Sequence, residues 1–306
     1  MIDVLQPGLL TTIQDSGRWG HQHFGVPVAG PMDRSSHRLA NLLVGNRASC
    51  ATLEVTLVGP QLAFGRDLLF AVTGAEFDLV LDDGRLAMNT VHAARAGQRL
   101  SFGPRRAGAR AYLAVAGGFD SPPVLGSRAT HVGSATGGLD GRALRTGDRL
   151  ALGADVERTA RPGDARQGVV RVAGPGARVR FIPGPHDDRF GPRGIATLEA
   201  GRYRITTDSN RMGYRLAGPP LEQAAAGELI SCAVPTGAIQ VPPSGEPILL
   251  MADHQTTGGY PRIGTVITAD VPVVAQRSPS DWLEFEACTL EVALRALIAH
   301  ERKLLE

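Results

Sequence analysis

Glycine and proline interrupt this sequence at short intervals along its whole length, and no other feature limits the possible fold as strongly. The 306 residues include 38 glycines and 21 prolines. Short apolar runs lie between them, for example at 68–72, 111–115 and 179–182. Because glycine and proline end helices but suit the turns between strands, the pattern predicts a mainly β protein whose many short strands form sandwiches or barrels.

Helical signals are few. A helix is predicted from Asp33 to Val44, with Pro31 and Asp33 suited to its start and Gly45 to its end. A second helix is predicted over Thr289–Leu305, where leucine and isoleucine recur at helical spacing on one face. A chain of 306 residues is long enough for two domains.

Two internal similarities indicate that β modules are reused. Residues 95–103 (RAGQRLSFG) match residues 145–153 (RTGDRLALG), and both predict a turn at the glycine followed by a strand. Residues 12–20 resemble residues 206–213 through the pattern D-S-x-R-x-G, with Val-Pro and a glycine further on in each case. This second similarity predicts that the two halves are diverged copies, with chance matching as the alternative.

The stretch from Ala154 to Gly176 is rich in glycine, proline and charge, and is the predicted linker between the halves. The predicted domains are therefore an N-terminal β domain at 1–165 and a C-terminal β domain at 166–306.

Lysine is almost absent. Lys303 is the one lysine, so 31 of the 32 basic residues are arginine. This excludes a Walker A loop, Schiff-base chemistry, a Ser-Ser-Lys amidase site and a covalently attached biotin. Phosphates or carboxylates must then be bound by arginine, helix N-termini or glycine-rich backbone. The net charge of +2 argues against a nucleic-acid or anionic-membrane surface.

Cys50, Cys232 and Cys288 are odd in number and form no C-x-x-C pair. We expect them to be reduced and to be buried as small hydrophobic residues. The N-terminus has no signal-peptide pattern and no apolar run is long enough to span a membrane, so a cytoplasmic, soluble protein is predicted.

Several longer motifs follow one another along the chain. They are 4–18 (VLQPGLLTTIQDSGR), 25–33 (GVPVAGPMD), 40–46 (ANLLVGN), 211–216 (RMGYRL), 237–242 (GAIQVP) and 253–261 (DHQTTGGYP). In this order, over nearly the whole chain, they resemble the C subunit of the bacterial ATP-dependent 5-oxoprolinase complex. The same family is labelled allophanate hydrolase subunit 2, KipA, or biotin-dependent carboxyltransferase domain, subdomains A and B. Ala29 stands where the family usually has serine, which argues against a catalytic hydroxyl at this position.

The resemblance implies two cyclophilin-like β-barrel domains with the site between them. It also implies two partners, namely the A subunit and a B subunit that is labelled allophanate hydrolase subunit 1 or kinase-inhibitor-like. The implied reaction converts 5-oxo-L-proline to L-glutamate with hydrolysis of ATP, which the complex holds with Mg²⁺. Two other functions stay open: carboxyl transfer from carboxybiotin to a urea- or amide-like acceptor, and regulation by binding a kinase-inhibitor homologue of the B subunit.

The segment Gln255–Tyr260 is the sharpest local candidate for binding. Its two threonine hydroxyls and two glycines predict an anion-accepting backbone nest, with Arg262 nearby. The alternative is a Gly-Gly hairpin turn, which spacing alone favours and the resemblance disfavours. The predicted substrate- or nucleotide-binding residues are Asp33, Gln240, Gln255, Thr256, Thr257, Gly258, Gly259 and Tyr260.

The D-S-x-R pattern places an aspartate three residues before an arginine in each half. In the functional interpretation, Asp15 orients Arg18 and Asp208 orients Arg211, and the loop Gln255–Tyr260 faces Asp15 and Arg18. In the alternative, each aspartate closes its own turn through an Asx hydrogen bond and the arginine is solvated. The predicted catalytic residues are Asp15, Arg18, Arg211 and His254, the last as a proton carrier.

Two further candidates are weaker. Asp33 is most simply the N-cap of the first helix. His21 and His23 form an H-x-H pair that would face one side of a strand, but no third ligand is evident and no metal site is predicted.

Overall fold

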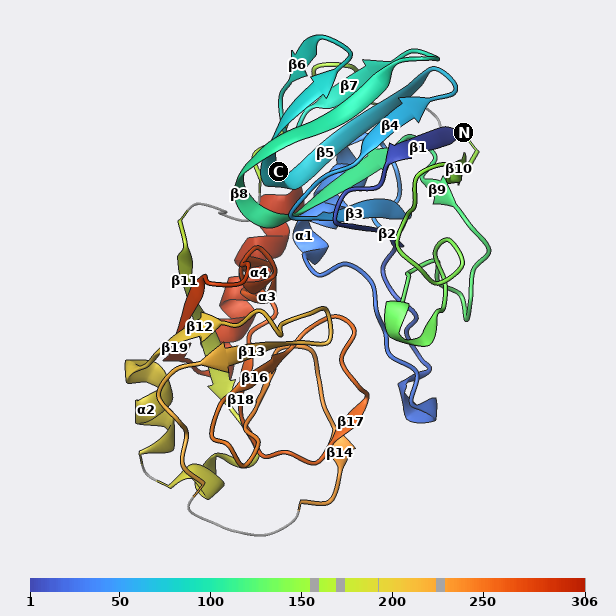
Figure 1. Cartoon of the computed structure of the whole chain (residues 1–306). Helices are drawn as coiled ribbons and strands as arrows, with labels where there is room; N and C mark the ends of the chain where they lie inside the picture. Colours follow the sequence, from blue (N-terminus) through green and yellow to red (C-terminus); the bar gives the residue numbers. More distant parts are fainter. Residues whose placement is uncertain (155–159, 169–173, 192, 224–228, 306) are drawn as a thin grey trace. The chain divides into compact units, whose positions relative to one another are not determined.

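The structure is a computed structural model that describes residues 1–154, 160–168, 174–191, 193–223 and 229–305 (Figure 1). The described residues fall into two compact units. The first unit comprises Met1–Trp19 and Ala29–Ala173, and the second comprises Gly20–Val28 and Gly174–Leu305. The linker predicted over 154–176 lies partly outside the described residues. The domain limits at 1–165 and 166–306, and the origin of the halves as diverged copies, stay predictions.

The first unit is built on one ten-stranded sheet that curls into a nearly closed barrel. The strands are β1 (Ile2–Gln6), β2 (Leu10–Gln14), β3 (Thr52–Thr56), β4 (Gln61–Phe64), β5 (Leu68–Leu81), β6 (Gly84–Leu86), β7 (Val91–Ala94), β8 (Arg99–Val115), β9 (Phe119–Asp120) and β10 (Arg149–Leu152). They follow the order β2-β3-β8-β4-β1-β10-β9, and β5 pairs with β6, β7 and β8. The long antiparallel pair of β5 and β8 forms the centre of this unit (Figure 1).

The two matching repeats of the first unit form the same turn. Gly97 and Gly147 have left-handed φ angles of 90° and 88°, which glycine adopts without a steric cost. In both turns the next residue donates its N–H to the carbonyl of the arginine three positions earlier. The strands β8 and β10 then begin at Arg99 and Arg149. The prediction of a turn followed by a strand is confirmed in both repeats.

The second unit contains a closed barrel of seven strands, in the order β11-β18-β15-β16-β13-β12-β19. The strands are β11 (Gly176–Pro183), β12 (Arg202–Ile205), β13 (Gly213–Ala217), β15 (Ala238–Gln240), β16 (Ile248–Leu250), β18 (Arg262–Val266) and β19 (Trp282–Ala287). A separate two-stranded ribbon pairs β14 (Cys232–Ala233) with β17 (Thr257–Gly258). Phe285 packs edge-on against Phe181 and Tyr203 in the barrel core.

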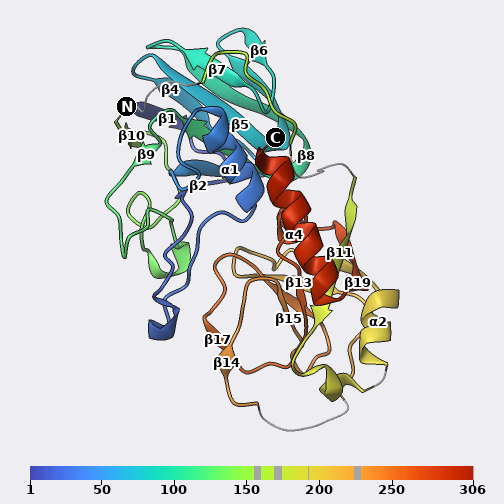
Figure 2. The same ribbon diagram turned by 180° about the vertical axis from the view of Figure 1, so that it is seen from behind.

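Helices are few, as predicted. They are α1 (Arg34–Leu43), α2 (Gly194–Ala200), α3 (Val271–Ala275) and α4 (Leu290–Leu305), with 3-10 turns at Gln22–Phe24, Val132–Ser134 and Asp187–Phe190. Helix α1 packs on β5 and β8 of the first unit (Figure 2). The mainly β fold class with two barrels is therefore confirmed.

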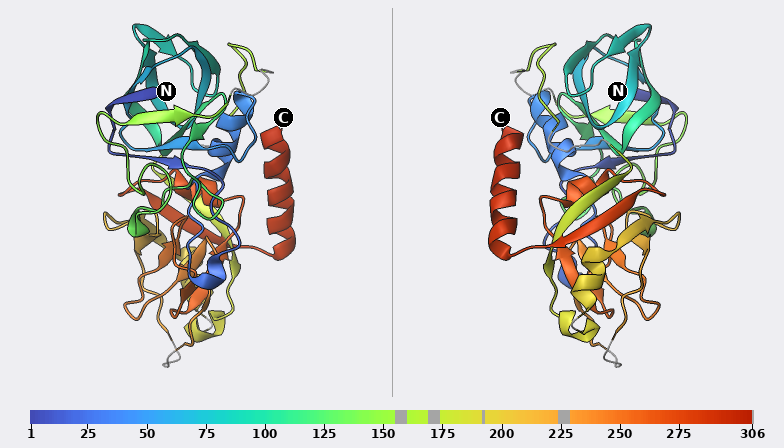
Figure 3. Two further views of the ribbon diagram at one scale, coloured as in Figure 1. Left: turned by 90° about the vertical axis from the view of Figure 1, so that its right-hand side faces the viewer. Right: turned by 90° about the vertical axis from the view of Figure 1, so that its left-hand side faces the viewer.

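Both predicted helices are present as α1 and α4. Helix α4 is a single straight helix (Figure 3). Its apolar stripe at Leu290, Leu294 and Ile298 is exposed. No helix in the described part of the chain is long and apolar enough to cross a membrane.

Candidate functional site

One face of the sheet in the first unit carries a row of buried polar side chains. In the strand register, Thr12 on β2 lies opposite Glu54 on β3. Glu54 lies opposite Tyr112 on β8, and Tyr112 lies opposite Thr73 on β5. Each of the four is at most 1% exposed. The intervening positions on these strands belong to the hydrophobic core: Ile13, Leu53, Val72 and Leu113. One side of the sheet is thus apolar, while the other is polar and needs hydrogen-bond partners.

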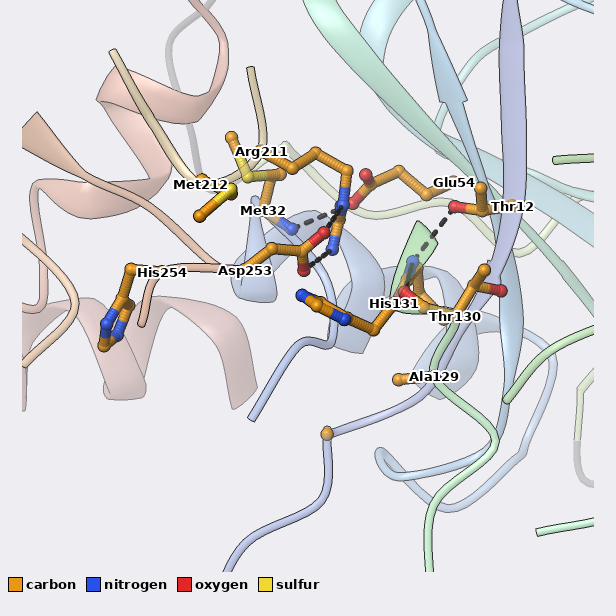
Figure 4. A network of polar contacts seen from close by, with 12 residues as sticks. Thr12, Met32, Glu54, Ala129, Thr130, His131, Arg211, Met212, Asp253 and His254 are labelled. Atoms are coloured by element: carbon orange, nitrogen blue, oxygen red, sulfur yellow. Dashed lines mark hydrogen bonds and ion pairs between the residues drawn. The ribbon is translucent and has the colours of Figure 1, made fainter. Parts of the chain in front are cut away.

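This polar row holds the segment that leads into helix α1. Glu54 Oε2 accepts hydrogen bonds from the Met32 N–H at 2.8 Å (Figure 4) and from the Tyr112 hydroxyl at 2.7 Å. The Tyr112 oxygen accepts one from the Asp33 N–H at 2.8 Å. Burial, reinforced by the charge of Glu54, raises the pKa of Tyr112 well above its usual value, so the phenol remains a donor. One carboxylate and one phenol therefore order this segment.

Asp33 is the N-cap of α1, as its sequence position predicted. Its Oδ1 accepts hydrogen bonds from the N–H groups of Ser35 and Ser36 at 3.0 and 2.9 Å. Its Oδ2 accepts one from the Ser36 hydroxyl at 2.7 Å. The carboxylate satisfies donors that the first helical turn leaves open. A role for Asp33 in binding substrate stays a prediction.

Asp15 joins two loops of the first unit. Its Oδ1 accepts a hydrogen bond from the Gly17 N–H at 2.9 Å, which closes an Asx turn, and another from the Ser127 hydroxyl at 2.5 Å. Its Oδ2 accepts one from the Arg128 N–H at 2.5 Å. The Asx turn of that alternative is therefore present at Asp15, but Arg18 is buried instead of solvated. The same carboxylate also binds a loop more than a hundred residues away.

Arg18 lies on the same loop pair. It is fully buried and donates a hydrogen bond to the Ala129 carbonyl. Gly137 leaves room for it, because a Cβ at that position would lie 2.6 Å from Arg18 Nη2. Asp15 and Arg18 are thus brought together against residues 127–137. Their catalytic roles stay predictions.

The loop at 127–137 contributes a histidine that no sequence motif singled out. His131 is buried, and its Nδ1 accepts a hydrogen bond from the Ser134 N–H at 3.2 Å. The neutral ring therefore carries its proton on Nε2. A sequence signal was available in the surrounding glycines, which mark a tight loop: Gly133, Gly137, Gly138 and Gly141.

In the second unit, Arg211 and Asp253 form a buried ion pair (Figure 4). Arg211 Nε donates to Asp253 Oδ2 at 2.9 Å, and Nη2 donates to Oδ1 at 2.8 Å. The two side chains are 7% and 6% exposed. Asp208 is exposed in the turn between β12 and β13. The prediction that Asp208 orients Arg211 is wrong, because a buried guanidinium requires a buried carboxylate and Asp253 provides it.

His254 follows this ion pair in the chain and is also buried. Its Nδ1 donates to the Gln255 carbonyl at 2.6 Å, since a carbonyl oxygen can only accept. In the neutral ring Nε2 is then unprotonated, and it accepts a hydrogen bond from the Thr236 hydroxyl at 3.0 Å. Thr236 is half-buried. This pairing of an imidazole with an accessible hydroxyl can carry a proton to or from a bound ligand.

The segment Gln255–Tyr260 is part of a crossover connection. It joins β16 to β18, but β15 lies between these strands and pairs with both. Thr257 and Gly258 form β17, whose partner is β14. The hairpin-turn alternative is therefore wrong, because the strands that the hairpin would connect are not neighbours.

Gly258 lies directly against the side-chain amide of Gln240. A Cβ on Gly258 would be 2.5 Å from Gln240 Nε2. Gln255 Nε2 donates to Gln240 Oε1 at 3.3 Å, so two carboxamides converge here. Neither Gly258 nor Gly259 has a left-handed φ, and the predicted backbone nest is not formed. Gly258 instead permits the close approach of Gln240.

The remaining residues of this segment lie near the surface. Thr256 is half-buried, and Thr257 and Tyr260 are exposed. That Thr256 and Thr257 bind substrate or nucleotide stays a prediction. That this segment faces Asp15 and Arg18 stays a prediction.

The described residues contain no cluster of metal-ligating side chains. In the part of the chain that the structure describes, no group of three or more His, Cys, Asp or Glu side chains could hold a metal ion. His21 and His23 lie at a 3-10 turn instead of a strand. The cysteines are free, and Cys232 is exposed while Cys50 and Cys288 are half-buried. The prediction that all three are buried is wrong, because Cys232 lies on the ribbon outside the barrel.

Comparison with known proteins assigns the chain to one family. The model described as "Carboxyltransferase domain, subdomain A and B" matches residues 24–287. The chain belongs to this carboxyltransferase-domain family. It is 41% identical to the 5-oxoprolinase C subunit of Escherichia coli over 97% of this chain and 94% of that protein. The corresponding subunit of Haemophilus influenzae is 38% identical over 96% and 94%. The resemblance to 5-oxoprolinase C subunits is therefore confirmed.

A solved structure shares the fold of this carboxyltransferase-domain chain. The crystal structure of the K. lactis urea amidolyase superimposes with a TM-score of 0.92 at 31% identity. The match covers 99% of this chain but 20% of that much longer chain. The fold is therefore shared with a protein in which further polypeptide is joined to this region.

Proposed function

We propose that this chain is a component of an ATP-dependent 5-oxoprolinase complex that opens 5-oxo-L-proline to L-glutamate, with the A and B subunits as its partners. The observation that carries the proposal is the similarity to two bacterial 5-oxoprolinase C subunits along 94% of their length. Carboxyl transfer to a urea-like acceptor is the second candidate, favoured by the TM-score of 0.92 to the urea amidolyase.

ATP belongs to the partner subunits in this proposal. The segment predicted to bind nucleotide does not fit a phosphate chain, because Gly258 is in a strand against Gln240 and neither glycine forms a nest. The chain also lacks a P-loop lysine. We assign the recognition of the lactam and the movement of its protons to this chain.

Lactam opening breaks a resonance-stabilised C–N bond and leaves a nitrogen that must gain a proton. His254 and Thr236 suit this task, because the imidazole is held at Nδ1 by the Gln255 carbonyl and contacts the Thr236 hydroxyl through Nε2. His254 Nε2 would first take up a proton from the attacking water by way of the Thr236 hydroxyl, and would then return it by the same route to the departing nitrogen. Arg211 would position the substrate from its ion pair with Asp253.

The test is co-expression with the partner subunits, followed by measurement of ADP and glutamate released from 5-oxo-L-proline. We expect turnover by the complex and none by the isolated chain. Thr236→Val should lower kcat by about tenfold to a hundredfold and flatten its pH profile, while Thr236→Ser should restore both. Turnover by the isolated chain, or a fully active Thr236→Val complex, would contradict these roles.

A further inference from the structure

One half-buried arginine of the second unit contrasts with three ion-paired arginines of the same barrel. On the same barrel, Arg180 pairs with Asp270, and both Arg178 and Arg202 pair with Glu284. Arg262, the first residue of β18, is half-buried. Its guanidinium makes no ion pair with any described carboxylate, and its Nε is buried without a hydrogen-bond partner. A guanidinium in this setting favours an anionic ligand.

A second unpaired donor lies beside it. Gln240 on β15 is the direct register partner of Arg262, and opposed residues on antiparallel strands point to the same side. The register shifts between Ile239 and Gln240, and such bulges re-aim side chains next to binding sites. Gln240 is 1% exposed, and its Nε2 has no hydrogen-bond partner among the described residues. Two neighbouring N–H groups therefore lack an acceptor oxygen.

Charged side chains of both signs lie near Arg262 and His186. The backbone N–H of Arg262 donates a hydrogen bond to His186 Nδ1 at 3.2 Å. Burial lowers the pKa of His186, and the charges of Arg262 and Arg189 lower it further, while Asp188 acts in the opposite direction. The imidazole therefore stays neutral beside the arginines.

We propose that Arg262 and Gln240 form a recognition site for the carboxylate of the substrate, an inference that rests on the proposed function only for the identity of that substrate. A carboxylate oxygen accepts from the Arg262 guanidinium and another from Gln240 Nε2. Gly258 of the ribbon lies against Gln240 Nε2 and, having no side chain, leaves this amide uncovered. Such a site selects 5-oxo-L-proline, which has a carboxylate, over urea, which has none.

The experiment compares 5-oxo-L-proline with its uncharged analogue 5-oxo-L-prolinamide as ligands of the full chain. Binding is followed by NMR, including the arginine Nε–H signals. We expect the acid to bind at least tenfold more tightly than the amide. Arg262→Gln should abolish this preference, whereas Arg204→Gln, which removes an equal charge from an exposed position of the same barrel, should leave it intact. Gly258→Ala should weaken acid binding by crowding Gln240, with the melting temperature unchanged.

Equal affinity for the two ligands in the wild type, absence of binding up to the solubility limit, or an unchanged preference in Arg262→Gln would overturn the site. Turnover of 5-oxo-L-proline by the reconstituted complex is scored separately. If the complex shows no such turnover but this chain still prefers the acid, the proposed function is contradicted and the carboxylate site is supported. Turnover that survives Arg262→Gln with unchanged KM contradicts the site alone.

Discussion

The pattern D-S-x-R-x-G occurs once in each unit, and its charged residues have different partners in the two. In the first unit both charged residues are buried, since Asp15 accepts from Ser127 and Arg128 and Arg18 donates to the Ala129 carbonyl. In the second unit the aspartate, Asp208, is exposed, and the arginine enters an ion pair with Asp253. The same local sequence thus buries both of its charged side chains in one unit and only the arginine in the other.

The difference follows from what covers each turn. In the first unit the pattern follows β2 and is covered by the loop that contains residues 127–129. In the second it forms the turn between β12 and β13, where the end of β16 brings Asp253 alongside Arg211. A short charged motif therefore specifies a turn, while the residues packed against it decide which charge is buried.

The largest effect should come from breaking the buried pair of the second unit. Asp253→Ala leaves the Arg211 guanidinium buried without its carboxylate and should lower the free energy of unfolding by about 3–5 kcal/mol. Urea unfolding followed by circular dichroism measures this. The double variant Arg211→Met with Asp253→Leu should recover most of the loss, because it removes both charges together. A loss below about 1 kcal/mol in Asp253→Ala would show that the pair is not desolvated.

Lowering the pH should destabilise the first unit through His37, which would distinguish it from the second unit. This histidine of α1 is fully buried, and burial lowers its pKa from 6.5 to about 4 despite the opposing charges of Asp15 and Glu54. The unfolded chain then binds the proton more readily. The contribution to stability is complete above pH 6.5 and is lost as the pH falls toward 4, by up to about 3 kcal/mol.

His37→Gln removes the titrating group and should flatten the dependence of the unfolding free energy on pH between 6.5 and 4. Urea midpoints measured at half-unit steps give the slope for wild type and variant. Parallel curves would show that the histidine does not titrate in this window.

A smaller effect separates the two aspartates of the repeated pattern. Asp15→Ala leaves the Ser127 and Arg128 donors without their acceptor and should cost about 2 kcal/mol of stability. Asp208→Ala, the matched control at an exposed position, should change stability by less than about 0.5 kcal/mol. Thermal unfolding of both variants makes the comparison. Equal losses at the two positions would mean that the pattern has the same role in both units.

Much of the fold was predictable from the sequence because its signals are local. The N-cap at Asp33 bonds residues two and three positions away, and the turns at Gly97 and Gly147 close over three residues. The mainly β class followed from the spacing of glycine and proline. Family membership followed from long motifs in a set order.

The candidate site was predictable only in part. Sequence motifs singled out Arg211, His254 and Gln240, and all three prove to be buried polar side chains. Their pairings were missed. Arg262 was expected near the segment Gln255–Tyr260, but its position opposite Gln240, and that of Thr236 beside His254, follow only from the fold. The connection through Gln255–Tyr260 was also ambiguous, since spacing cannot tell a hairpin from a crossover.

The sequence by itself determined where this chain turns, caps its helices and alternates apolar residues, since these depend on contacts between residues a few positions apart. The tertiary structure alone decided which charges are paired. Arg211 meets a carboxylate 42 positions away, and Asp15 meets a hydroxyl 112 positions away. Burial makes such pairs obligatory, because a desolvated charge without a partner costs several kcal/mol, whereas the sequence only supplies the groups from which the fold selects.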